Sequence, residues 1–281
     1  MYGSGVISSI LFRPVPHADW NMDLLIIGIA ALLASALTLF SGFGLGTVLT
    51  PVFVLFFPVP LAVAATAIVH FANNLFKFVL LAKQADWSVV ARFGIPAAIA
   101  ALVGALLLDR FDRLPPLLVY QWGATSHEIT VLKTLMGLLM IGFAWLELWP
   151  RFQVLAFPAR YLPLGGVLSG FFGGLSGNQG PFRAAFLIKL GLSKEAFVAT
   201  GVVLAIIVDI ARLLVYGTGF LADHFSRSQE LVLPVAVGTL CAFAGVMIGT
   251  RVLEKITLRT VQLVVAGMMA LVGIGLVTGL L

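Results

Sequence analysis

Charged side chains are scarce in this sequence. Of its 281 residues only 10% are charged, whereas 60% are apolar, and the mean hydropathy is +1.09. A soluble domain of this length needs a more polar surface, and long apolar stretches are typical of membrane spans. The net charge of +5 does not indicate nucleic acid, because the basic residues cluster at the ends of apolar runs. We therefore expect a protein of the lipid bilayer.

Cysteine and enzyme motifs are also scarce. Cys241 is the only cysteine, which excludes an internal disulfide and any multi-cysteine metal or redox motif. His127-Glu128 lacks the second histidine of a zinc-protease motif, and there is no Walker loop, nucleophile elbow or paired intramembrane carboxylate. We predict neither an enzyme nor a bound cofactor or metal. Active transport would then use an ion gradient or a partner.

Ten apolar segments follow one another along the chain. Most can cross a hydrocarbon core of roughly 30 Å at about 1.5 Å per residue. Two are short, 48–57 and 182–190, and each follows a glycine-rich break. The residues 110–128 are expected to form a loop. The longer segments are expected at 22–40, 61–82, 89–108, 129–149, 196–216, 231–250 and 258–280, and the segment 161–172 leads into the second break.

The two breaks suggest an internal duplication. The first, 41–51, has the sequence SGFGLGTVLTP, and the second, 173–181, has the sequence GGLSGNQGP. Aligning Gly44 with Gly174 places Pro51 on Pro181. Further pairs follow in order at growing offsets: Thr66 with Thr200, Pro96 with Pro234, and Gly104 with Gly245. These matches predict two repeats, 22–150 and 161–281, with a connector at 151–160 and an N-terminal segment at 1–21.

Charge placement separates crossing segments from re-entrant ones. If all ten segments cross, nine basic residues fall on one side and four on the other. Re-entrant short segments would give a split of six to seven, so only the first arrangement obeys the positive-inside rule. Five crossings per half invert the second repeat relative to the first. We predict an all-α polytopic membrane protein with two inverted five-segment repeats, broken helices near the midplane, a cytoplasmic connector and extracytoplasmic termini.

The breaks favour a small anion. A helix that begins inside the membrane directs free N–H groups and a partial positive charge at whatever precedes it. We expect the short helices to begin after Pro51 and Pro181, with glycines that allow a close approach to the backbone. The alternative is that the glycines only let helices pack closely. The candidate binding residues at the breaks are Gly44, Gly46, Thr47, Thr50, Gly177, Asn178 and Gln179.

A polar stripe crosses the segment 61–82. His70, Asn74 and Lys77 share one helix face, with Asn73 beside them. The stripe indicates a pore-lining face, with His70 as a possible proton carrier. Hydrogen bonding between helices and an outward-reaching Lys77 are the alternative explanations.

Three further charged residues are candidates. Arg183 follows the second break and can hold a sulfonate or carboxylate, unless its side chain reaches out to the headgroups. Asp209 and Arg212 stand three residues apart and can form an ion pair on one helix. This pair either neutralises itself or serves gating or proton coupling.

These motifs resemble those of the sulfite exporter TauE/SafE family of bacterial membrane transporters. The resemblance rests on GFGLGTVLTP, NNLFK and GLSGNQGP and covers about residues 23–280. It implies export of small sulfur oxyanions or organosulfonates. By position it points to Gly42, Gly44, Gly46, Pro51, Asn73 and Asn74, and to Gly174, Gly177, Asn178, Gly180 and Pro181.

The expected function is therefore secondary transport of sulfite or a short organosulfonate across the bacterial inner membrane. The inside-negative potential favours anion export by about 2.3 kcal/mol per charge per 100 mV, so no coupled ion is required. Proton coupling through His70 or Asp209 is the alternative. Two other classes stay open, an intramembrane enzyme acting on lipid and a non-transporting accessory subunit. A homodimer is possible.

Overall fold

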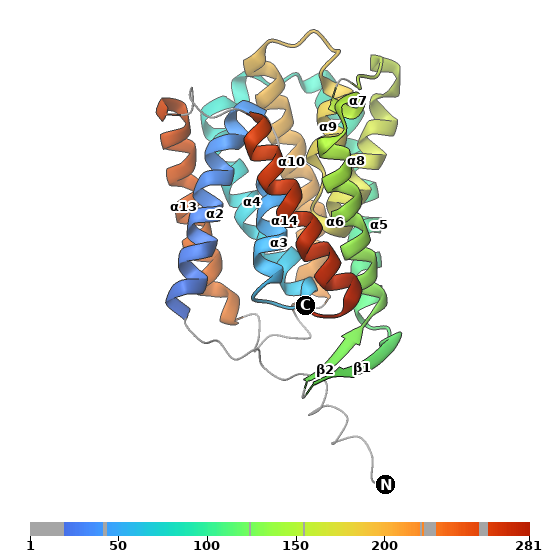
Figure 1. The fold of residues 1–281 in the computed structure, drawn as a ribbon. Coiled ribbons are helices and arrows are strands. Elements are labelled where there is room, and N and C mark those ends of the chain that lie inside the picture. The colour runs from blue at the N-terminus through green and yellow to red at the C-terminus, as the bar shows by residue number, and fades with distance from the viewer. Residues whose placement is uncertain are drawn as a thin grey trace.

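The computed structural model describes residues 20–41, 44–123, 125–153, 155–219, 221, 229–252 and 258–281. The expected N-terminal segment 1–21 lies almost wholly outside these residues, as does Gly42. The described chain forms a bundle of helices that run along one common direction (Figure 1). The fold is mostly helical, as predicted.

The helices follow the predicted segments closely. Among the described residues, five stretches are long and apolar enough to cross a membrane: Val59–Gln84, Trp87–Asp112, Val131–Leu148, Lys194–Thr218 and Gln229–Gly249. The helices are α2 (Trp20–Ser41), α3 (Leu45–Val54), α4 (Val59–Leu81), α5 (Trp87–Asp112), α6 (Val131–Leu148), α7 (Pro150–Gln153), α8 (Leu162–Ser176), α9 (Gly180–Leu187), α10 (Lys194–Thr218), α13 (Val232–Val252) and α14 (Leu258–Thr278). Short 3₁₀ turns stand at η1 (Ala82–Gln84), η2 (Ala159–Tyr161) and η3 (Gln229–Leu231).

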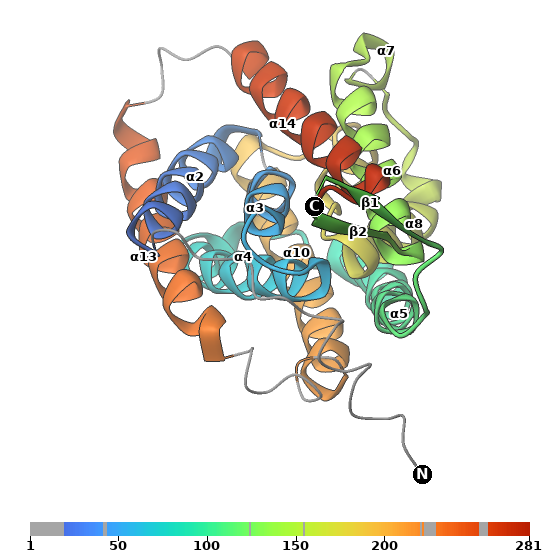
Figure 2. The ribbon, with the colours of Figure 1, turned by 60° about the horizontal axis from the view of Figure 1, so that its bottom comes forward.

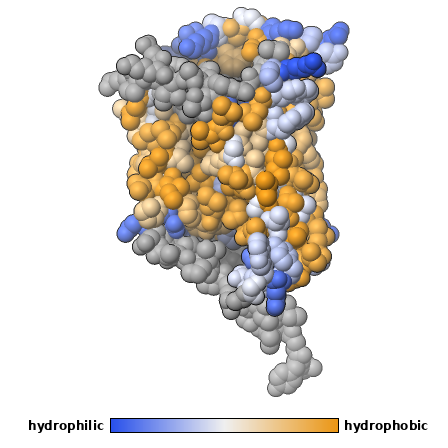
Figure 3. All heavy atoms as spheres, viewed as in Figure 1, coloured by the Kyte–Doolittle hydropathy of each residue, from blue (hydrophilic) through white to orange (hydrophobic). Residues whose placement is uncertain are grey.

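The outer surface of the bundle carries a broad apolar band. Figure 3 shows this band around the middle of the molecule, with hydrophilic residues at the two ends. Large apolar side chains on its outer face are strongly exposed, for example Val79 at 83% and Leu271 at 73%. Such a surface is stable only against lipid tails, so the chain is a membrane protein.

The segment between α5 and α6 differs from the expected loop. The strands β1 (Leu118–Trp122) and β2 (Thr125–Ile129) pair antiparallel and form a hairpin at the lower end of the bundle (Figure 1). β-branched and aromatic residues alternate here, and Gly123 has the positive φ of 65° that a tight turn requires. The Tyr120 hydroxyl donates to Thr278 O at 2.6 Å, which ties the hairpin to the end of α14.

The first short helix begins earlier than predicted. α3 begins at Leu45 and not after Pro51, which is its seventh residue. Gly44 has a φ of 128°, a conformation open to glycine, and turns the chain into the helix there. Pro51 only removes one hydrogen bond to the preceding turn. Pro181, in contrast, lies in the first turn of α9, as predicted.

The second break is shorter than the glycine pattern suggested. α8 continues through Gly173 and Gly174 to Ser176, and Gly177 ends it with a left-handed φ of 81°. Gly174 stays helical because α8 packs backbone to backbone against α5. A Cβ on Gly166, Gly170 or Gly174 would collide with the carbonyl of Phe93, Ala97 or Ala101 respectively. Close packing, the alternative explanation, therefore accounts for Gly174.

Helix boundaries correct the alignment of the two halves. α2 and α8 end at Ser41 and Ser176, α3 and α9 begin at Leu45 and Gly180, and α4 and α10 begin at Val59 and Lys194. Each pair of bounds lies 135 positions apart, five more than the 130 that separate Gly44 from Gly174 and Pro51 from Pro181. The same offset pairs Asn74 with Asp209 and Lys77 with Arg212.

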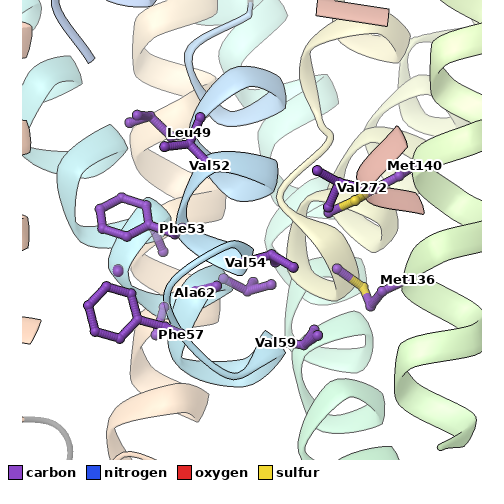
Figure 4. Packing of buried hydrophobic residues seen from close by; sticks show 14 of the residues in the cluster. Leu49, Val52, Phe53, Val54, Phe57, Val59, Ala62, Met136, Met140 and Val272 are labelled. Carbon is purple, nitrogen blue, oxygen red and sulfur yellow. The ribbon is translucent and has the colours of Figure 1, made fainter. Parts of the chain in front are cut away.

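The helices pack in pairs that join the two halves. α5 packs on α8, α2 on α13 and α6 on α14, while α4 and α10 pack on each other (Figure 2). Gly137 of α6 and Gly273 of α14 each lie against the other's carbonyl. The apolar core lies around α3, with Phe53 and Phe57 on one side of the helix and Met136 and Val272 on the other (Figure 4).

Candidate functional site

The buried carboxylate of Asp209 joins the two long central helices, α4 and α10. Asp209 of α10 is fully buried, and its Oδ2 lies 2.6 Å from Nδ1 of His70 on α4. Its Oδ1 accepts from Nη2 of Arg212 at 2.7 Å and from Nε at 3.0 Å. The predicted pairing of Asp209 with Arg212 is thus confirmed. Two charges removed from water are tolerated because each is met by hydrogen bonds as well as by the opposite charge.

Gln179 connects this pair to Arg183. Gln179 stands at the N-cap position of α9, where its Nε2 donates to Asp209 Oδ1 at 3.3 Å. Its Oε1 accepts from Nη1 of Arg183 at 3.4 Å. The Ser169 hydroxyl of α8 donates to the backbone carbonyl of Gln179 at 2.8 Å. The second break is therefore held between α8 and α10 by side chains.

Arg212 and Tyr216 donate hydrogen bonds to backbone carbonyls at the end of α8. Arg212 Nη1 donates to Gly173 O at 3.3 Å, and the Tyr216 hydroxyl donates to Gly174 O. Gly173 O also accepts from the backbone N–H of Gly177 at 3.0 Å. Carbonyls at a helix end otherwise lack a partner within the helix, so the two side-chain donors stabilise the end of α8. Sequence reasoning missed Tyr216. Its spacing from Asp209 and Arg212, seven and four residues, could have placed it on the same face.

The two breaks meet at Gly46 and Gly177. A Cβ on Gly46 would lie 3.0 Å from Gly177 O, and one on Gly177 would lie 3.4 Å from the Thr50 hydroxyl. The Thr47 hydroxyl donates to Gly44 O at 2.7 Å, within the first turn of α3. Thr50 Oγ1 is buried and has no hydrogen-bond partner among the described residues. The structure thus brings the predicted glycines and threonines of the first break onto the second break.

Asn178 lies within the second break. Its Nδ2 donates to the Ser176 hydroxyl at 3.3 Å, while its Oδ1 has no hydrogen-bond partner among the described residues. Its side chain is buried. A buried polar atom without a partner is costly, and at a break in the membrane it indicates a place for water or ligand.

The polar stripe of α4 is buried, but its two asparagines face different helices. Asn74 Nδ2 donates to His70 O at 2.8 Å and stays with the His70 face. Asn73 Oδ1 instead accepts from the Ser35 hydroxyl of α2 at 3.0 Å. Asn73 Nδ2 has no hydrogen-bond partner within the described chain. Asn73 therefore does not join the residues around Asp209.

Cations predominate among the buried charged residues. Lys77 is 4% exposed and Arg183 is 5% exposed, so neither side chain reaches out of the protein. Across the described residues the buried charged side chains comprise Lys77, Arg183 and Arg212 against the carboxylate of Asp209, with His70 beside them. A buried excess of positive charge favours a negatively charged ligand.

Both short helices also present their N-termini here. Within the described residues, no side chain caps α3 or α9. Their first N–H groups and the positive ends of their dipoles add to the attraction for an anion. No group of acidic, histidine or cysteine residues suited to a metal ion is found in the described part of the chain.

A bundle of lipid-exposed apolar helices around a buried, cation-rich break defines a multi-pass membrane protein of the transporter kind. The family model for the sulfite exporter TauE/SafE matches residues 27–276, nearly the whole chain, and the chain belongs to this family. The family predicted from the sequence is thereby confirmed. Comparison with curated proteins found no match, and neither did comparison with solved structures.

Proposed function

We propose that this protein is a secondary transporter that exports a small sulfur-containing anion, sulfite or a short organosulfonate, across the bacterial cytoplasmic membrane. The observation that carries the proposal is the contact between the two breaks at Gly46 and Gly177, beside buried cations. Unpaired backbone at membrane depth is tolerated where water or substrate can satisfy it. Membership of the sulfite exporter family supports the class of anion.

The residues divide into two roles. Arg183, Lys77 and Thr50 supply charge and a hydroxyl for the anion, together with the first N–H groups of α3 and α9. A guanidinium can hold two oxygens of a sulfonate or sulfite through paired N–H donors. Asp209 and Arg212 hold Gln179 and the end of α8, and so keep the second break in position for gating.

We further propose that the two halves are inverted repeats. The shared offset of 135 and the exchange of partners, α2 with α13 and α5 with α8, support a duplication related by a two-fold axis. In Figure 1, α3 leads to a turn at the lower end of the bundle and α9 leads to the upper end. Ten crossings would then place both termini outside the cytoplasm, consistent with the distribution of basic residues.

Labelling of single cysteines tests this topology. In a Cys241→Ala background, Asn21→Cys and Pro58→Cys stand at exposed positions at the start of α2 and just before α4. Ten crossings put the two on the same, extracytoplasmic side, and re-entrant short helices would put them on opposite sides. An impermeant thiol reagent on intact cells distinguishes the two arrangements.

The function is tested with purified protein and with proteoliposomes. Sulfite or methanesulfonate at about 100 times its dissociation constant should stabilise the fold by about 2.7 kcal/mol, measured as a rise in melting temperature. Arg183→Ala should weaken anion binding about tenfold to a hundredfold, because a hydrogen bond to a charged group is lost. Arg113→Ala is the matched control, since this arginine is half exposed and pairs with Asp109 at the surface.

The outcomes separate the classes of function. Anion uptake that is lost in Arg183→Ala and retained in Arg113→Ala supports the transporter. If no sulfur anion stabilises or crosses with the protein, the proposal is wrong. Turnover of a lipid would instead indicate the intramembrane enzyme, and inertness in both assays the accessory subunit.

A further inference from the structure

His70 is positioned to hold a proton next to the proposed anion site. Asp209 is ionised beside Arg212, so its Oδ2 can only accept, and His70 Nδ1 at 2.6 Å must carry the hydrogen. This fixes the tautomer of the imidazole. The other ring nitrogen, Nε2, then has a lone pair that can take up a second proton. Neither Arg212 nor Gln179 contacts His70 in the described hydrogen bonds, since both donate to the other oxygen, Oδ1.

The charges around His70 come from few elements. Asp209 and Arg212 on α10 and Arg183 on α9 act on it electrostatically, and Lys77 lies two turns further along α4. α3 has no charged side chain. The other described charges on neighbouring elements are Asp23 in the first turn of α2, Lys83 in η1, Lys194 and Glu195 in the first turn of α10, and Arg92, Asp109, Arg110 and Asp112 on α5.

We propose that His70 Nε2 binds one proton together with the anion, so that occupation of the anion site and protonation of His70 are coupled. This inference rests on the proposed anion transport. Without an anion, a proton on His70 would add positive charge near Arg183 and Arg212, which is unfavourable in a buried site. A bound anion removes that repulsion. By linkage, the proton then strengthens anion binding by the same factor.

The step is a proton transfer alone. The proton moves from water to the Nε2 lone pair, and no electrons are exchanged. Asn74 Nδ2 lies 3.1 Å from Nδ1 and 3.3 Å from Nε2, and because Nδ1 carries the hydrogen, the amide can donate only to Nε2. The amide therefore has to turn and present its oxygen once Nε2 is protonated. One sulfonate monoanion and one proton together add no net charge to the buried site.

The experiment uses the full chain in detergent and methanesulfonate, whose own acid is too strong to titrate near neutral pH. Binding should be about tenfold or more tighter at about pH 5.5 than at about pH 8, a coupling of ordinary size. His70→Gln should remove this pH dependence. His127→Gln is the matched control, because His127 lies in the hairpin near Gly279 and should leave the dependence unchanged.

A second measurement does not depend on any variant. Methanesulfonate added to the unbuffered wild-type protein should raise the pH, as one proton is taken up for each anion bound. The inference is overturned if binding occurs without proton uptake, or if His70→Gln binds and keeps the pH dependence. Absence of binding at every pH would instead overturn the proposed transport function itself.

Discussion

A short helix follows a longer apolar helix at two places in the chain, α3 after α2 and α9 after α8, yet the side chains around the two junctions differ in kind. Beside the first break, α3 contributes glycine and threonine. Beside the second, α9 contributes Gln179 and Arg183, and α10 adds a buried carboxylate. The offset of 135 places neutral Asn74 where the second half has Asp209.

The two halves are therefore alike in the spacing of their helices and different in the side chains beside the breaks. The shared spacing of the helices gives both halves a helix N-terminus beside the break, which any anion site of this kind requires. Among the described residues, the buried carboxylate that orients His70, Gln179 and Arg212 comes from the second half alone. We infer that the two breaks act together at one site and that the second half sets its polarity and its protonation.

The largest expected effect concerns Asp209 and its counterpart. Asp209→Ala should lower the free energy of unfolding by about 3–5 kcal/mol, because it leaves the buried charge of Arg212 without compensation. Asn74→Ala, at the matched position of the first half, should cost about 1 kcal/mol. Thermal unfolding of the purified variants in detergent measures both values. Equal losses would contradict the division between a charged and a neutral half.

The next effect concerns the glycine that ends α8. Gly177→Ala should cost about 1–2 kcal/mol for its left-handed backbone. It should cost about 1 kcal/mol more for crowding, since the new Cβ lies 3.1 Å from Arg212 Nη1. Gly191 has a similar φ of 70° and open space around it, so Gly191→Ala should show the backbone cost alone. Identical melting temperatures for the two variants would show that Arg212 does not crowd a side chain at position 177.

The smallest effect compares two tyrosines. Tyr216→Phe removes the buried hydrogen bond to Gly174 O and should cost about 1–3 kcal/mol, because that carbonyl is left unsatisfied. Tyr120→Phe removes a partly buried hydrogen bond to Thr278 O in the hairpin and should cost about 0.5–1.5 kcal/mol. The same unfolding assay measures both. A larger loss at Tyr120 would mean that the hairpin, and not the second break, limits stability.

Sequence reasoning recovered the long helices and one ion pair. Helix boundaries agreed within a few residues for the long segments, and Asp209 paired with Arg212 as its spacing predicted. It missed the β-hairpin, because a short run of alternating residues between two long helices resembles an ordinary loop. It also missed Tyr216, whose partner is a backbone carbonyl of another helix.

The sequence by itself determined that this is a helical membrane protein with two glycine-rich breaks and a polar stripe, because composition and periodicity are local properties. Only the tertiary structure decided where the breaks lie. Gly174 stays helical because α5 leaves no room for a side chain, and α3 begins at Leu45 because Gly44 turns the chain. Asn73 and Asn74 likewise face different helices, because Asn73 accepts a hydrogen bond from Ser35 of α2 while Asn74 stays on the His70 face of α4, which packs against α10.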